Sequence, residues 1–194
     1  MIDGPKTSPM RRLETAGRRF AADQAGAAAV EMALVATPFL VLLFGIIELA
    51  MIFLISSSLE NATAQASRTI RTGEMQTTGT STAAAFKAAI CNNFGWLQSD
   101  CATNLYVDVR TFTTFAAAGA FVASPAAADQ PIANKTFDAT KLQFTPGGPS
   151  DIVVVRAYYQ WPLIVPGMTK ALETLTNKAV ITSIATFRNE PYGT

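Results

Sequence analysis

The stretch that decides the fold is residues 27–55, which reads AAAVEMALVATPFLVLLFGIIELAMIFLI. Apart from Glu31, Glu48 and a few small polar residues, it is apolar throughout. A helix needs about 20 apolar residues to cross the ~30 Å of bilayer hydrocarbon, so this run is long enough to span a membrane. A basic segment precedes the run and a chain of ordinary soluble composition follows it, as expected for a single membrane anchor.

The two glutamates limit where a membrane lies along the run. Only residues 32–47 separate them, which is about 24 Å of helix at 1.5 Å per residue. A carboxylate at the bilayer centre costs about 2.5–3.5 kcal/mol. We therefore expect either a glutamate at each interface of a short span or a partner that compensates one charge. For Glu48, a headgroup position and a pairing with another helix both remain open.

The residues before the run set the expected orientation. Residues 1–26 carry an excess of basic side chains: Lys6, Arg11, Arg12, Arg18 and Arg19, against Asp3, Glu14 and Asp23. Positive flanks stay on the cytoplasmic side, which predicts a cytoplasmic N-terminus and an external C-terminal part. A cleaved secretory signal is the alternative, with residues 62–64 as a loose cleavage site. The apolar run is, however, much longer than the 7–15 residues typical of such signals.

Composition excludes several classes of function. The chain has 194 residues, 15 Lys+Arg against 14 Asp+Glu, no His and two Cys. Balanced charge argues against a nucleic-acid partner. Without His, catalysis by Ser-His-Asp or Cys-His and metal binding by imidazole are ruled out, so we expect no metal, no cofactor and no enzymatic activity. Asp108, Asp151 and Glu173 are candidate catalytic carboxylates, but solvated surface positions explain them better.

Residues at the start of the run form a recognisable pattern. Gly26 ends the basic leader, the small Ala27 follows, and Glu31 stands five residues after the glycine at the head of an apolar helix. This resembles the cleavage site of class III signal peptides in type IV pilin-like proteins, in particular the Tad (tight adherence) branch. Residues 38–48 and 66–73 resemble the helix core and helix end of TadE-like proteins, and residues 185–192 resemble their C-terminal strand. Met32 departs from the major pilins, which have an aromatic residue there.

The resemblance implies a role. Major pilins of this branch are very short, whereas residues 27–194 remain after the cut, so the chain resembles a TadE-like minor pilin or pseudopilin. By that resemblance a prepilin peptidase cuts between Gly26 and Ala27, and the new ammonium of Ala27 pairs with Glu31 of a neighbouring subunit to set the axial register. Pro38 is then either a passive kink or a point where the helix melts during assembly.

Partners and location follow from the same resemblance. The expected partners are the prepilin peptidase, other Tad pilins or pseudopilins, the inner-membrane assembly platform and membrane lipid. The expected location is the bacterial inner membrane, with one pass and a periplasmic C-terminal domain, and incorporation into an extracellular pilus as a further destination. The expected contribution is to pilus initiation, the pilus tip or length control, and to adhesion.

The remainder of the chain predicts an α+β head of the type IV pilin-like class. Helical spacing continues past the membrane, so we expect a leader over 1–26, one long helix over 27–73 that is transmembrane at about 30–55, and a head domain over 74–194. Alternating apolar residues predict strands near 105–110, 151–161 and 178–188. These would form a small three-stranded antiparallel sheet packed on the helix.

Two features of the head leave alternatives open. Cys91 and Cys101 lie outside the membrane by the topology argument, and an oxidising compartment favours a disulfide over a reactive thiol or a metal ligand. Residues 116–150 are rich in Ala, Pro and Gly and predict a flexible insertion. Its apolar residues either dock on the sheet or contact another protein.

Two other functions compete with the pilin-like interpretation. An uncleaved, single-span binding module would keep Arg18 and Arg19 as permanent anchors and leave Glu31 merely interfacial. A periplasmic enzyme is less well supported, because the sequence has no nucleophile–base pair, metal cluster or phosphate-binding loop. Cleavage after Gly26 distinguishes the first alternative from a pilin-like subunit.

Overall fold

The computed structural model describes residues 24–164 and 170–192. The chain divides into two units, residues 1–44 and 45–194. The basic leader, including Arg11, Arg12, Arg18 and Arg19, lies almost entirely outside the described residues.

A single long helix, α2, covers Gln24–Arg71 and contains Pro38. Its apolar residues favour a helix over most of its length. Gly73, at a φ of 76°, ends it in the left-handed conformation typical of helix C-termini. The expected long helix is confirmed, and its N-terminal end lies three residues earlier than expected.

The head contains a three-stranded antiparallel sheet in the order β1-β4-β5. The strands are β1 (Leu105–Phe112), β4 (Ile152–Pro162) and β5 (Lys178–Arg188), which confirms the expected strands and fold class. In the register of the pairs, Val109 lies opposite Val155, and Val155 opposite Ala185. A separate two-stranded hairpin joins β2 (Ile132–Ala133) to β3 (Thr136–Phe137).

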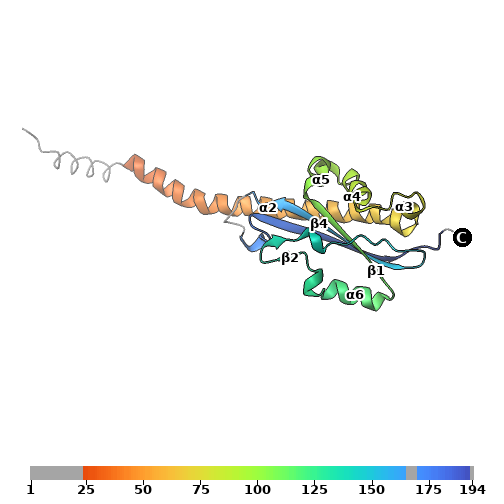
Figure 1. Cartoon of the computed structure of the whole chain (residues 1–194). Helices are drawn as coiled ribbons and strands as arrows, with labels where there is room; N and C mark the ends of the chain where they lie inside the picture. Colours follow the sequence, from red (N-terminus) through yellow and green to blue (C-terminus); the bar gives the residue numbers. More distant parts are fainter. Residues whose placement is uncertain (1–23, 165–169, 193–194) are drawn as a thin grey trace, which may run out of the picture. The chain divides into compact units, whose positions relative to one another are not determined.

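Both faces of this sheet are covered. One face packs on the part of α2 beyond Gly45 and on α4 (Ala83–Asn92), and α6 (Phe115–Ala123) lies on the opposite face (Figure 1). Strand β4 is central, and its residues 152–160 are all buried. The strand is therefore buried on both faces, and its polar residues Arg156 and Gln160 are buried together with the apolar ones.

The main core lies between α2 and the sheet. It is built from apolar residues of α2, α4 and the three strands that share one side: Ile55, Leu59, Ala62, Ala66, Ile70, Phe86, Ile90, Leu105, Val107, Val109, Val153, Val155, Ala157, Tyr159 and Ile181. A smaller cluster on the other side joins Ala118 of α6 to Ile152 and Val154. The three- and four-residue spacing on α2 therefore does the packing that its periodicity predicted.

The remaining elements are short. They are α3 (Glu74–Thr77), η1 (Gly95–Leu97), α5 (Gln98–Asn104), η2 (Ala127–Asp129), η3 (Ala139–Lys141) and η4 (Lys170–Leu172). Residues 116–150, for which the sequence predicts the least order, thus contain most of α6, the β2–β3 hairpin and two 3-10 turns.

Candidate functional site

The first part of α2, residues 26–44, presents apolar side chains on every side. Met32, Leu34 and Val35 are each more than two-thirds exposed, and Phe39 is 62% exposed. The helix is long and apolar enough to cross a membrane. Exposed leucine, valine and phenylalanine around a whole helix indicate that a lipid or protein environment covers it.

The residues of the expected cleavage motif lie in the first turns of this helix. Gly26 and Ala27 are exposed, and a Cβ at Gly26 would meet no atom within 4 Å. Packing therefore does not explain the glycine. Glu31 is also exposed and forms no ion pair or hydrogen bond with the described residues. Its charge stands alone among apolar neighbours, which is costly in lipid unless a partner is supplied.

Pro38 interrupts the hydrogen-bond ladder of the same segment. Proline has no N–H, so the carbonyl of Leu34 loses its usual helical partner. At the residue directly before the proline, the hydroxyl of Thr37 donates to the carbonyl of Ala33 at 2.8 Å. The helix nevertheless continues through the proline as one element.

Glu48 has a different environment from Glu31. Its side chain is fully buried, and its Oε1 accepts a hydrogen bond at 2.6 Å from the backbone N–H of Ile164, just after β4. The second oxygen, Oε2, has no hydrogen-bond partner among the described residues. Sequence reasoning anticipated a headgroup or another helix as partner and missed this contact, because no local pattern links residues 116 positions apart.

A comparison with known protein families finds a match within helix α2. The sequence profile of the TadE-like protein family matches residues 26–68. Helix α2 is TadE-like. The match confirms the resemblance over this segment, which is less than half of the chain, and does not extend to the C-terminal strand. No curated protein and no solved structure matches the chain.

The family match concerns the helix alone: residues 26–68 are similar to a TadE-like protein, and the match does not extend to the head over 74–194. The long apolar helix is consistent with a membrane anchor. Among the described residues, no group of three or more His, Cys, Asp or Glu side chains is placed to hold a metal ion.

Beyond the TadE-like helix, a disulfide links Cys91 at the end of α4 to Cys101 in α5, with a Cα–Cα distance of 5.5 Å. The bond fixes the two short helices that pack beside β1 and β4. The disulfide expected from the sequence is therefore present, and it tethers α4 to α5.

The covered outer face of the sheet contains a buried ionic network. Asp108 on β1 lies opposite Arg156 on β4, and its Oδ2 accepts hydrogen bonds from Arg156 Nε at 2.9 Å and Nη2 at 2.6 Å. Arg110, two residues along β1, bonds Asp108 and Asp129. Asp108 is fully buried, while Arg110 and Arg156 are 8% and 4% exposed.

This network fastens the insertion to the sheet. Arg110 also donates to the carbonyl of Lys141 at 2.8 Å, and the backbone N–H of Gln143 donates to Asp108 Oδ1 at 2.7 Å. The Phe121 ring stacks below both guanidinium groups, with its centroid 4.1 Å from Arg156 Cζ and 5.0 Å from Arg110 Cζ. The insertion is therefore docked on the sheet, which is one of the two alternatives that the sequence left open.

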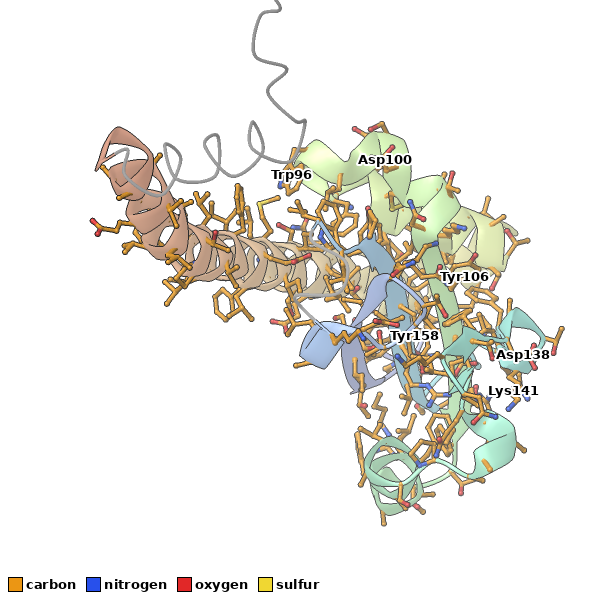
Figure 2. All side chains as sticks on the ribbon, turned by 90° about the vertical axis from the view of Figure 1, so that its left-hand side faces the viewer. Trp96, Asp100, Tyr106, Asp138, Lys141 and Tyr158 are labelled. Carbon is orange, nitrogen blue, oxygen red and sulfur yellow. A yellow bond between two sulfur atoms is a disulfide. The ribbon has the colours of Figure 1, made fainter. Side chains whose placement is uncertain are left out.

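Aromatic contacts attach the β2–β3 hairpin to the same face. Phe137 lies with its ring centroid 4.6 Å from that of Tyr106 and 5.8 Å from that of Tyr158. Figure 2 shows the two tyrosines on the sheet. Phe137 and Phe121 are apolar residues of the insertion, and their contacts with the sheet are seen only in the folded chain.

The candidate carboxylates all have structural partners. Asp108 belongs to the buried network, Asp151 accepts a hydrogen bond from the backbone N–H of Gly148 at 2.8 Å, and Glu173 bonds Lys135 at 3.0 Å. The hydrogen bond from Lys135 is the main cause that lowers the pKa of Glu173, and the positive charge of Lys135 lowers it further.

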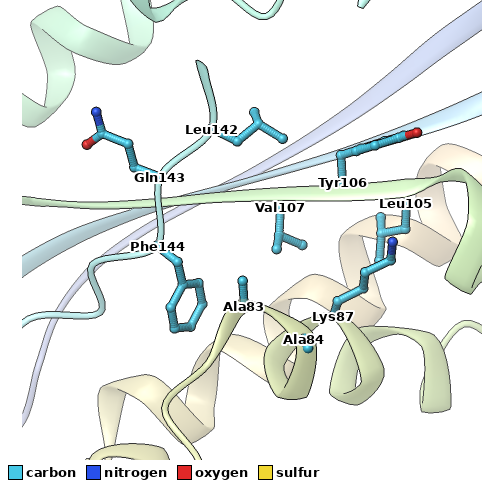
Figure 3. Close-up of a pocket in the computed structure, with 9 residues that line it drawn as sticks. All are labelled: Ala83, Ala84, Lys87, Leu105, Tyr106, Val107, Leu142, Gln143 and Phe144. Atoms are coloured by element: carbon cyan, nitrogen blue, oxygen red, sulfur yellow. The ribbon is translucent and has the colours of Figure 1, made fainter. Parts of the chain in front are cut away.

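A shallow hollow of about 270 Å³ lies beside β1, between α4 and the segment before β4 (Figure 3). Its floor includes Val107, and Lys87 lies over the Tyr106 ring at 5.4 Å from the centroid. Burial lowers the pKa of Lys87. One cation and a largely apolar floor do not define a catalytic site.

Proposed function

We propose that the chain is a minor pilin or pseudopilin that takes part in assembling a Tad-type pilus. The observation that carries this proposal is the isolated charge of Glu31 on an otherwise apolar and exposed helix within the TadE-like segment. Such a helix suits two environments in turn, the bilayer before assembly and the packed helices of a filament after it.

The chemistry of the helix N-terminus supports a pairing role for Glu31. Cleavage between Gly26 and Ala27 would create an ammonium group about one helical turn from the carboxylate. Compensating both charges in an apolar interior is far less costly than burying either alone. A carboxylate near a helix N-terminus is also favoured by the helix dipole. Pairing between neighbouring subunits would then fix their axial register.

The head would lie on the periplasmic side in this arrangement. The basic leader favours a cytoplasmic N-terminus, and the Cys91–Cys101 disulfide suits an oxidising compartment. The proposed partners are the prepilin peptidase, sister pilins and the inner-membrane assembly platform. Initiation, tip and length-control roles, with adhesion, are all compatible with a head of this size.

The first experiment is a mass measurement of the N-terminal peptide from cells with and without the prepilin peptidase. A start at Ala27 that requires the peptidase is the expected result. An intact Met1 in both strains would overturn the pilin-like proposal and favour the uncleaved, membrane-anchored binding module. A Gly26→Ala variant serves as a control, because packing does not require glycine there and only the peptidase should detect the change.

A further inference from the structure

The sheet has one long open edge, along β5. Strand β1 at the opposite edge is partly covered, because the N–H and carbonyl of Val109 bond Gln143 and Thr145, each at 2.8 Å. Strand β5 pairs only with β4 among the described strands. A sheet edge exposes a row of backbone donors and acceptors that can pair with another strand.

The hydrogen bonds at the two ends of β5 show which of its residues face this edge. The N–H of Lys178 bonds the carbonyl of Leu175 at 3.0 Å, on the side away from β4. At the other end, the N–H of Glu190 bonds the carbonyl of Arg71 at 2.8 Å. Backbone groups of alternate residues point to the same side of a strand.

It follows that Thr182, Ile184 and Thr186 direct their N–H and carbonyl groups outward from β5. No described residue pairs with these groups. The open length lies between two closed ends, so it fits a short strand of roughly seven residues at ~3.4 Å each.

A groove of about 420 Å³ runs between this edge and α2. It is lined by Ala64, Ser67, Arg68, Arg71, Ala185 and Phe187. A strand added beside β5 would place every second side chain over this groove, because side chains alternate between the two faces.

The groove contains polar groups without partners. Ser67 is only 4% exposed, and its hydroxyl has no hydrogen-bond partner among the described residues. Arg68 is exposed and forms no ion pair within the described part of the chain, whereas Arg71 pairs with Glu190 at 3.0 Å. A buried hydroxyl and an uncompensated guanidinium at one groove favour an occupant that brings a carboxylate.

We propose that the β5 edge, together with this groove, binds an extended acidic segment of a partner protein by strand addition, with a carboxylate of that segment contacting Arg68. A second copy of β5 fits less well, since Lys178–Arg188 contains no Asp or Glu and would leave Arg68 uncompensated. This surface goes beyond the proposed pilus function and does not depend on cleavage at Gly26 or on Glu31.

The test uses the full-length chain in non-ionic detergent micelles and an array of heptapeptides. Valine occupies alternate positions of each peptide, and the other positions carry Glu, Gln, Lys or Ala. We expect binding to prefer Glu over Gln at one position by about tenfold, as a charge-assisted hydrogen bond would give. An Arg68→Gln variant should remove that preference, whereas Lys170→Gln, outside the groove, should keep it.

Backbone pairing is tested separately. Ile184→Pro removes an outward N–H, which an edge strand tolerates, and should weaken binding at least about tenfold. Ile184→Thr retains the N–H and should bind as the parent does. N-methylation of the peptide at alternate residues should abolish binding in one parity only, which tests pairing even if the proline variant fails to fold.

Three results would overturn the proposal: no acidic heptapeptide binds, Glu and Gln peptides bind equally, or N-methylation has no effect in either parity. Sedimentation of the full-length chain provides the remaining check. A concentration-dependent dimer that Ile184→Pro abolishes would assign the edge to a second copy instead of an acidic partner.

Discussion

At the scale of single residues, the backbone conformation and the space around position 73, just after α2, both favour glycine. Its φ of 76° suits glycine, and a Cβ built there would lie 2.2 Å from Tyr192 Cγ. Gly79 has a similar φ of 71° but open space around it. Substituting each of the two glycines therefore allows the cost of backbone strain to be measured apart from the cost of a clash with Tyr192.

We predict that Gly79→Ala costs about 1 kcal/mol of unfolding free energy through backbone strain alone, and that Gly73→Ala costs about 1–3 kcal/mol more because the methyl group displaces Tyr192. Urea unfolding of the full-length chain in micelles measures both. Adding Tyr192→Ala to Gly73→Ala should recover much of the difference. Equal losses at the two glycines would show that the Tyr192 contact does not restrict Gly73.

Glu48 is the second residue whose environment makes a specific prediction. Its Oε1 is the hydrogen-bond acceptor for the N–H of Ile164 in a fully buried position. Glu48→Ala leaves that N–H unpaired and should cost about 1–3 kcal/mol. Glu48→Gln retains an acceptor oxygen and should cost less. Thermal unfolding followed by circular dichroism would detect the ranking, and the reverse ranking would mean that the contact contributes little.

At the scale of elements, local patterns predicted most of what the structure contains. Alternation placed Leu105, Val107 and Val109 on one face of β1, and these residues pack in the main core. The same alternation placed Asp108 on the other face, where a charged residue normally meets water. Burial there depends on an insertion whose contacts are distant in sequence, so no periodicity revealed the network.

The Asp108 network yields a prediction about how the insertion is held. Asp108→Asn removes the charge that compensates Arg156 and should cost about 3–5 kcal/mol, because Arg156 loses its carboxylate partner and Arg110 keeps only Asp129. Limited proteolysis should then cut within residues 124–150 sooner than in the parent. Arg71→Gln breaks an ion pair that is about half exposed and should cost under about 1 kcal/mol.

The two variants thus compare a buried network with a surface ion pair in the same domain. If Asp108→Asn resists protease as well as Arg71→Gln does, then the apolar contacts of Phe121 and Phe137, rather than the ionic network, hold the insertion on the sheet.

At the scale of the whole molecule, the chain combines a helix whose first part is exposed among the described residues with a head that has a buried core. The same helix carries exposed apolar residues over 26–44, whereas Glu48, Ile52 and Ile55 further along contact the head. Among the described residues, the core of the head contains none from 26–44. That segment is available for lipid and, on our proposal, for the helices of other subunits.

The bilayer and the proposed filament have opposite effects on the charge of Glu31. In the bilayer its charge is only a cost, so Glu31→Ala and Glu31→Gln should leave membrane insertion intact. In a filament the ammonium of a neighbouring Ala27 would lose its partner, at about 3–5 kcal/mol per contact, enough to reduce incorporation by well over tenfold. Glu60→Gln, an exposed glutamate on the same helix, is the matched control. Quantifying the chain in sheared pili and in membranes separates the two effects, and a Glu31 variant that enters pili as efficiently as the Glu60 variant would remove the pairing role while leaving the anchor in place.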